Sequence, residues 1–399
     1  MGTRYRPFTL YSLTTGLLGG KRAWLTAPLL AFLLFVFLYP IGGMLARSFK
    51  VDAVVTALPR TTAFAANWSG DGEQPAAAAL AALAQDLREA KTADVASAGT
   101  VLNYFVPGAR SLLIVTERRV KALPQDEAIE LIAGDRRWRN GELWNAIRDV
   151  SGRYTGAYYK RIADATWENG SLKLGIYSNF YIRSFWISLV VTVLSLIVGY
   201  PMAYMISKQS ARTRNMLLFL VMIPFWTSLL ARTAAWLIIF QKDGPLNQLM
   251  LFIGLIAEPL DLLFSRGAVY VAMVHVMVPF VVLPVFAVMK GIPRQQMQAA
   301  ASLGAHPYVG FWRVYVPQTM PAIASSALLV FTMTLGYYIT PLLLGGADDQ
   351  MISYSIANHT LQTGNWGLAA ALASVLLIVT VLICSLYLAI IGKRGIAAS

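Results

Sequence analysis

The sequence predicts an all-α polytopic membrane protein with six membrane-spanning helices and one long, mainly helical insertion outside the bilayer. Hydrophobic residues make up 57% of the chain and charged residues only 13%, and the mean hydropathy is +0.56. Soluble domains are about one quarter charged, so this composition excludes an ordinary soluble fold. The single cysteine, Cys384, excludes a disulfide framework and a metal site built from the cysteines of one chain.

Six segments are long and apolar enough to cross a bilayer, which takes about 20 residues for a hydrocarbon core about 30 Å thick. They are residues 23–46, 184–206, 215–240, 268–289, 321–344 and 367–392. Basic residues precede the first segment, but its apolar run exceeds the ~7–15 residues of a signal peptide, so we expect a retained anchor. A further apolar stretch, residues 246–264, contains Glu258, Pro259 and Asp261. We interpret it as a periplasmic amphipathic or re-entrant segment packed on the bundle.

The positions of lysine and arginine predict the orientation. Twelve of them, with no Asp or Glu among them, lie in the four segments that six spans place on one side: residues 1–22, 207–214, 290–320 and 393–399. Positive charge marks cytoplasmic segments, so both termini are expected in the cytoplasm. These residues account for nearly all of the net charge of +13, which leaves little reason to infer nucleic-acid binding.

Residues 47–183 form a polar insertion that this orientation places in the periplasm. It holds 18 basic and 15 acidic residues, and such long segments are largely exempt from the charge rule. Two groups of apolar residues have helical spacing: Leu80, Leu83 and Leu87, and Leu143, Trp144, Ile147 and Val150. Residues 111–115 are expected to form a short strand, and residues 69–75 a loop.

Motifs for catalysis are absent from the sequence. The nearest approach to a phosphate-binding loop, Gly20-Lys21, is followed by Arg22 and lacks the first glycine at the required spacing. There is no His-Glu-x-x-His motif, no catalytic pair of carboxylates in an apolar setting, and only three histidines. We therefore expect no enzymatic activity, cofactor or metal in this chain, and any ATP to be bound by a partner.

Residues 294–323 predict a helix, a tight turn and a second helix on the cytoplasmic side. The Ala-rich stretch 295–303 lacks a strong helix breaker, and Gly304 suits the left-handed position that ends a helix. Pro307 suits the first turn of the second helix. By itself the pattern favours a plain connector between two spans.

The second helix is expected to carry Phe311, Trp312 and Val316. Pro317 and Pro321 follow, and we expect them to break the chain ahead of the fifth span.

This segment resembles the EAA loop of permease subunits in the binding-protein-dependent ATP-binding cassette importer family. The family pattern is Glu-Ala-Ala, three residues, Gly, and a hydrophobic stretch that ends in Pro. Ala299, Ala300, Gly304 and Pro317 match it at the right spacing. Gln298 stands where the family usually has Glu, so the charge is lost, but an amide can still form hydrogen bonds.

Other segments resemble spermidine/putrescine-type permeases of the same family, in this order: FWISLVVTVLSLIVGYPMAY, IPFWTSLLARTAAW, MVPFVVLPVF and GYYITPLLLGG. The resemblance covers the first span and roughly residues 180–392, whereas the insertion is a departure from the family. It implies the type I importer permease fold, with a permease core at residues 184–392, in a bacterial inner membrane. It also implies a second permease subunit, two ATP-binding cassette subunits that hydrolyse ATP, and a periplasmic solute-binding protein. The helix from Gln298 to Gly304 would sit in a groove of the ATP-binding subunit.

Polar and aromatic residues within the spans are candidate pathway residues, because polar groups are costly in a bilayer. Arg232 either lines the pathway or extends to the membrane interface, and His275 either lines it or joins two helices. Four aromatic residues either stack on an organic cation or belong to interfacial belts of aromatic residues: Trp226, Trp236, Tyr337 and Tyr338.

The solute is the least determined part of the prediction. The six spans contain no Asp or Glu, although a polyamine would be expected to meet carboxylates. Periplasmic Asp348 and Asp349, the partner permease or the binding protein are the candidates to supply them. The resemblance favours a polyamine or a related small organic solute, and an anionic or metal-chelate solute is the alternative.

A secondary transporter that works without ATP is the alternative of a different class. The EAA-like loop and the lack of carboxylates within the spans disfavour it. The insertion is expected to help dock the solute-binding protein, with an inert structural appendage as the alternative.

Overall fold

The computed structural model describes residues 23–67, 75–163, 165–168 and 171–397. The chain divides into two compact units, Met1–Tyr158 and Tyr159–Ser399. Five of the described helices are long and apolar enough to cross a membrane, and a pair of helices bent by 95° is a further candidate. Six candidate spans result when the bent pair counts as one, in agreement with the predicted number.

The first span belongs to unit 1 and is a helix with one irregular turn. It consists of α2 (Ala23–Leu33), a π-helical turn (Leu34–Leu38) and α3 (Tyr39–Phe49). The wide turn comes just before Pro40, which has no N–H to donate, and such local adjustments let membrane helices tolerate proline. The described apolar side chains of this span are exposed, apart from half-buried Leu45.

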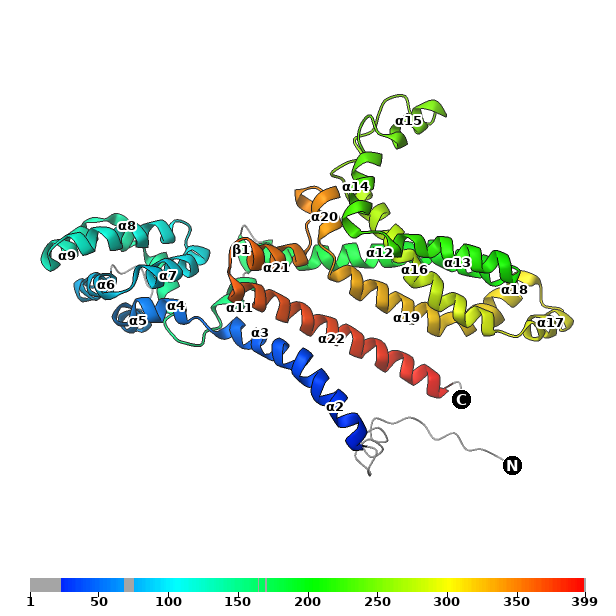
Figure 1. The fold of residues 1–399 in the computed structure, drawn as a ribbon, viewed down its shortest axis with the longest axis horizontal. Helices are drawn as coiled ribbons and strands as arrows, with labels where there is room; N and C mark the ends of the chain where they lie inside the picture. Colours follow the sequence, from blue (N-terminus) through cyan, green and yellow to red (C-terminus); the bar gives the residue numbers. More distant parts are fainter. Residues whose placement is uncertain (1–22, 68–74, 164, 169–170, 398–399) are drawn as a thin grey trace. The chain divides into compact units, whose positions relative to one another are not determined.

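The rest of unit 1 is a small helical domain, drawn in blue to cyan in Figure 1. Its helices are α4 (Asp52–Ala57), α5 (Pro59–Ala66), α6 (Ala77–Glu89), α7 (Thr92–Phe105), α8 (Ala109–Ala122), α9 (Gln125–Gly134), a 3-10 turn (Arg136–Arg139) and α10 (Gly141–Asp149). The indole rings of Trp138 and Trp144 are fully buried in its core.

The periodicity of apolar residues correctly predicted two of these helices. The three leucines of α6 are buried, and so are the four apolar residues on and just after α10. The strand predicted at residues 111–115 is wrong, because this segment lies inside α8. Its burial continues through Leu112, Leu113, Thr116 and Val120 at helical spacing, which a five-residue window does not reveal. Most of the predicted loop, residues 69–74, lies outside the described residues.

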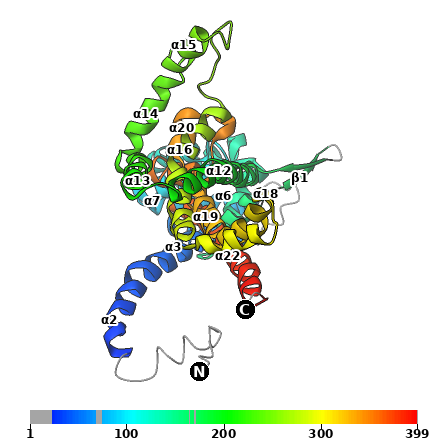
Figure 2. The same ribbon diagram turned by 90° about the vertical axis from the view of Figure 1, so that its right-hand side faces the viewer.

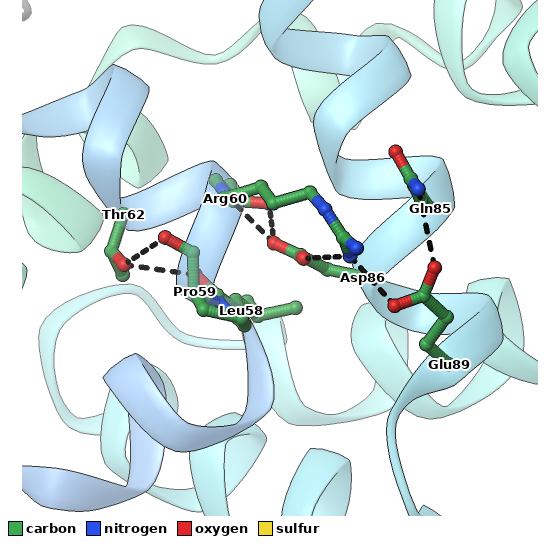
Figure 3. Close-up of polar contacts among 8 residues, drawn as sticks. Leu58, Pro59, Arg60, Thr62, Gln85, Asp86 and Glu89 are labelled. Atoms are coloured by element: carbon green, nitrogen blue, oxygen red, sulfur yellow. Dashed lines mark hydrogen bonds and ion pairs between the residues drawn. The ribbon is translucent and has the colours of Figure 1, made fainter.

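A buried carboxylate joins α5 to α6. Asp86 is 1% exposed and accepts hydrogen bonds from the amide and hydroxyl of Thr61, at 2.7 and 2.8 Å. Arg60 donates to Asp86 at 3.2 Å and to Glu89 at 2.8 Å, as Figure 3 shows. These bonds compensate for the loss of water around the buried charge, so we interpret the cluster as structural.

The first and last residues of the helical domain lie next to each other in space. The Thr155 amide donates to the Phe49 carbonyl at 2.8 Å, and the Val51 amide donates to the Arg153 carbonyl at 3.2 Å. Lys50 and Tyr154 form an isolated antiparallel bridge between them. The domain proper therefore consists of residues 51–153.

Unit 2 begins within α11 (Ala157–Ile162) and continues with a two-stranded antiparallel hairpin, β1 (Ala165–Glu168) and β2 (Ser171–Leu174). Its longer helices are α12 (Ile176–Ser207), α13 (Ala211–Trp226), α14 (Leu229–Ile239), α16 (Arg266–Gly291), α19 (Val316–Leu335) and α22 (Trp366–Ala397). Shorter elements are α15 (Pro245–Phe252), α17 (Arg294–Ser302), α18 (Pro307–Gly310), η3 (Phe311–Tyr315), α20 (Ile339–Leu344), η4 (Ala347–Asp349) and α21 (Ile352–Leu361).

The core of unit 2 is formed by α12, α16 and α19, which run side by side (Figures 1 and 2). Six of the ten buried residues of α12 are small or weakly polar, as is common where membrane helices approach closely: Ser184, Ser188, Thr192, Ser195, Gly199 and Ala203. A Cβ at Gly199 would lie 2.8 Å from a methyl group of Val281 in α16. The glycine therefore permits the close contact between these two helices.

The third span differs from the prediction. The sequence predicted one helix over residues 215–240, but the chain breaks at Thr227 and Ser228 and turns by 95° between α13 and α14. Hydropathy stays high through the break, so the composition did not reveal it. Pro224, in the last turn of α13, is the local signal for it. Beyond the break, α14 and α15 project away from the bundle (Figures 1 and 2).

The fifth span also differs from the prediction. Helix continues from Pro307 to Leu335, so Pro317 and Pro321 do not break the chain, and α20 is a separate short helix. The turn η3 is π-helical and lies directly before Pro317. Its wider hydrogen-bond spacing accommodates a residue that has no N–H.

Candidate functional site

The EAA-like segment has the predicted helix, turn and helix. Helix α17 ends just before Gly304, whose φ of +81° lies in the left-handed region that favours glycine. The Ala305 amide donates back to the Ala300 carbonyl at 3.0 Å, and Pro307 occupies the first turn of α18. The segment lies at one end of the unit 2 bundle, and α20 and α21 lie at the other (Figure 1).

The two faces of α17 have different surroundings. Ala300 and Met297 face Gly310 in α18, where an added Cβ would lie 3.9 Å from the Ala300 Cβ and 3.2 Å from the Met297 Cε. Gln298 and Ala299 are exposed on the other face. The structure therefore brings Gln298, Ala299 and exposed Gly304 to one surface, while Ala300 packs inward.

Two further residues complete the description of this segment. Pro317 is exposed on the first turn of α19, and α18 and η3 separate it from α17. Leu303, which sequence analysis did not select, is 89% exposed at the end of α17. The only available signal was a leucine standing alone beside a run of alanines and glutamines.

Arg232 lies within electrostatic range of two other candidate pathway residues, His275 and Tyr337. The charge of Arg232 acts on both His275 and Tyr337. The Arg232 Nη1 donates to the carbonyl oxygen of Pro224, and its buried Nε has no hydrogen-bond partner among the described residues. The imidazole of His275 also meets the ring of Trp236 edge to face, with centroids 5.6 Å apart.

The aromatic candidates Trp226 and Tyr338 have other neighbours. Trp226 is 78% exposed at the end of α13, where its ring contacts Phe225. Tyr338 is half-buried and caps the start of α20.

A groove of about 760 Å³ lies between α12, α13, α14 and α16. Its lining is mostly aliphatic, with Trp236, Tyr270 and His275 among the lining residues. Of the candidate pathway residues, Trp236 and His275 line it. Aliphatic side chains offer no partner to a charged solute, so this groove suits hydrocarbon or apolar side chains.

Two adjacent carboxylates near α20 have opposite environments. Asp348 has a side chain that is 94% exposed and lies 3.5 Å from the Arg183 guanidinium. Asp349 is buried, accepts from Arg266 at 2.7 Å and accepts from the Gly346 amide at 3.1 Å. Asp348 is therefore accessible to a ligand, whereas Asp349 stabilises the loop. The sequence analysis did not identify the Arg266–Asp349 pair, because 83 residues separate its members.

Among the residues that the structure describes, no group of three or more His, Cys, Asp or Glu side chains could hold a metal ion.

A bundle of apolar helices with a broken span, an apolar groove and an exposed helix–glycine–helix loop defines a polytopic permease subunit. The chain belongs to the family of binding-protein-dependent transport system inner membrane components, whose sequence pattern matches residues 183–394. This confirms the predicted family, the helical permease fold and the function as a permease subunit of a binding-protein-dependent importer. Membership also places the protein in an inner membrane.

The relatives of the chain are transport permeases and not enzymes. It is 32% identical over 216 residues to the spermidine/putrescine transport system permease protein PotB of Haemophilus influenzae, covering 53% of this chain and 76% of that protein. PotB of Escherichia coli K12 is 32% identical over 212 residues, with 53% and 77% covered. The molybdenum transport system permease protein ModB of Azotobacter vinelandii is 30% identical over 155 residues, with 39% and 67% covered.

Among solved structures, similarity to this chain is found in an importer of a polysaccharide. A bacterial ABC transporter involved in the import of the acidic polysaccharide alginate matches at 20% identity and a TM-score of 0.41, covering 53% of this chain and 79% of that chain.

Proposed function

We propose that the chain forms half of the translocation pathway of an ATP-driven importer and that α17 couples it to ATP hydrolysis on a separate subunit. The observation that carries this proposal is the exposed face of α17, which ends at a left-handed Gly304 and matches the family's loop pattern. The complete importer would contain a second permease subunit, two ATP-binding cassette subunits and a periplasmic solute-binding protein. The twelve basic residues counted above support cytoplasmic termini, a cytoplasmic loop at residues 290–320 and a periplasmic insertion.

The proposed mechanism is a shift between inward-facing and outward-facing states. A ligand shifts such an equilibrium only when it binds the two states unequally. ATP closes the pair of ATP-binding subunits and so favours one state. Gln298, Ala299 and Leu303 seat α17 in a groove of the ATP-binding subunit, and packing of Met297 and Ala300 on α18 carries the movement to the fifth span.

A polyamine is the proposed solute. The names of the PotB relatives support it, and Asp348 supplies an exposed carboxylate that fits an ammonium group. The insertion is proposed to dock the solute-binding protein over the pathway.

An anionic solute is the second candidate. The buried Nε of Arg232 favours it, because this donor lacks a partner among the described residues while the six spans contain no carboxylate.

Reconstitution of the complete importer in liposomes tests these proposals. Radiolabelled spermidine should enter only with ATP and the solute-binding protein, and a Walker-motif variant of the ATP-binding subunit should abolish entry. Uptake that needs an ion gradient but no ATP would contradict the importer proposal. Competition by an oxyanion such as molybdate, with no competition by putrescine, would replace the polyamine with the anionic candidate.

A further inference from the structure

The ammonium group of Lys208 lies between two tyrosine rings from different parts of unit 2. Its Nζ is 5.1 Å from the ring centroid of Tyr204 and 5.0 Å from that of Tyr315. The two rings meet edge to face, 5.5 Å apart. Both distances lie within the ~6 Å at which a cation is attracted by the face of an aromatic ring.

The residues of this contact come from two elements that are distant in sequence. Tyr204 and Lys208 are one helical turn apart, at the end of α12 and just beyond it, whereas Tyr315 ends the π-helical turn η3. Phe311 closes the cluster from η3, 5.4 Å from Tyr204 and 5.7 Å from Tyr315.

The same cluster is continuous with α17. Phe311 follows Gly310, the glycine against which Met297 and Ala300 of α17 pack. Tyr315 is 3% exposed, so its ring is held in one position. Close contacts therefore join α17 to η3.

Lys208 also stands at the turn between two spans. Helix α12 ends at Ser207 and α13 begins at Ala211, so only residues 208–210 separate them. A contact held at Lys208 acts on both helices at once.

We propose that Lys208 is a positioning residue whose contact with the rings of Tyr204 and Tyr315 joins the α17–η3 segment to the α12–α13 turn, so that movement of α17 also reorients the second and third spans. This inference rests on the proposed coupling of α17 to ATP hydrolysis. In contrast to packing on α18 alone, it gives the ATP-binding subunit a second route into the bundle.

The test compares variants of the complete importer in liposomes, with radiolabelled spermidine as the probe. Lys208→Met keeps the apolar stem and removes the charge, and Tyr315→Leu removes one ring. Lys208→Arg keeps a cation that can stack on the rings, and Tyr315→Phe keeps the ring. Lys290→Met is the matched control, because Lys290 is an exposed basic residue at the end of α16.

The quantity measured is spermidine taken up per ATP hydrolysed, together with assembly of the complex. Lys208→Met and Tyr315→Leu should each lower this ratio about three- to tenfold with assembly intact, as expected for the loss of one or two cation–π contacts. The double variant should lose little more than either single variant, because both remove the same contact. Lys208→Arg, Tyr315→Phe and Lys290→Met should keep the ratio of the wild type.

Three outcomes would overturn the inference. The first is an unchanged ratio in Lys208→Met. The second is an equal decrease in Lys290→Met, which would indicate a general effect of charge. The third is a ratio in Lys208→Arg that is as low as in Lys208→Met. A wild-type complex that takes up spermidine without ATP would instead contradict the proposed function, and with it the coupling on which this inference depends.

Discussion

Arg232 donates a hydrogen bond to the carbonyl oxygen of Pro224 across the 95° break between α13 and α14. The last carbonyls of a helix have no partner within it, and in a bilayer no bulk water replaces that partner. The guanidinium supplies one donor at this point. Arg232 therefore stabilises the broken span, whether or not it also contacts solute.

Replacing Arg232 with Met should lower the unfolding temperature of the detergent-solubilised complex. The Pro224 carbonyl would lose one of its two donors and keep the Thr227 hydroxyl, which donates to it at 3.0 Å, a loss of about 1 kcal/mol. Arg232→Lys should recover part of the loss, and Arg313→Met, at an exposed position in η3, should have little effect. Loss of uptake with an unchanged unfolding temperature would show that Arg232 acts in the pathway and not at the break.

Cysteine labelling tests the orientation. After Cys384→Ser, an impermeant maleimide added to intact cells should label Ser151→Cys in the insertion but not Ser302→Cys at the end of α17. Ser302→Cys should react only after lysis. Labelling of both sites from outside would contradict the six-span orientation.

Gly304→Asp should block uptake while the subunit still inserts and assembles. A side chain at φ +81° is strained, and the carboxylate adds a charge at the proposed contact with the ATP-binding subunit. Gly304→Asn is the control, because asparagine adopts the left-handed region and has nearly the same size without the charge. Normal uptake by the Asp variant would remove the main support for coupling through α17.

Removal of the insertion tests its docking role, and the structure determines where to cut. Deleting residues 69–164 would remove α6 and α10 but keep α5, which packs against both of them. Deleting residues 51–153 removes the whole helical domain, and the two cut ends, Lys50 and Tyr154, are already neighbours in space. Joining Lys50 to Tyr154 through a short Gly-Ser linker should weaken stimulation of ATP hydrolysis by the solute-binding protein. Basal hydrolysis and assembly should persist. Unaltered stimulation at subsaturating binding protein would contradict docking, and lost assembly would indicate a structural role.

Glu117 should make the insertion sensitive to acid. Its burial works to raise the pKa, but hydrogen bonds from Lys121 at 2.7 Å and Thr92 at 2.6 Å outweigh it, so the pKa of Glu117 lies below its ordinary value. A depressed pKa contributes stability above the unfolded-state pKa, and that contribution is lost as the pH falls through the folded-state pKa.

The protection of the α7 and α8 amides against hydrogen exchange, corrected for the pH dependence of the intrinsic exchange rate, should therefore fall below about pH 4.5. Glu117→Gln should reduce this dependence on pH, and Glu142→Gln, at an exposed position, should leave it unchanged. An equal pH dependence in the wild type and in Glu117→Gln would contradict this assignment.

The parts of the fold that were predicted correctly depend on local patterns. Hydropathy located the spans, and the spacing of Leu80, Leu83 and Leu87 located α6, because each signal lies within one helix. The break after Pro224 was missed because the segment on each side of it is equally apolar. The continuity of helix through Pro317 was missed because a π-helical turn, which the sequence does not mark, accommodates the proline.

The candidate site divides in the same way. The helix that ends at Gly304 was predicted because a short motif contains all of it. Two contacts of the site join residues that are far apart in sequence, so no local pattern predicts them. They are the contact of Lys208 with Tyr315 and the ion pair of Arg266 with Asp349. Ala300 was expected to face the ATP-binding subunit, but in the structure it packs against Gly310 of α18. The sequence of α17 alone does not reveal this contact, because it depends on the position of α18.

Because Lys50 and Tyr154 are bridged, residues 51–153 can be replaced as a unit by another domain. Because its two ends meet, the distance that a replacement must span is that between neighbouring strands, about 5 Å. A fluorescent reporter or an epitope domain with adjacent termini could take its place without stretching the chain on either side. The same position would accept a domain that binds a different delivery protein, which offers a way to redirect the importer while its helical bundle stays unaltered.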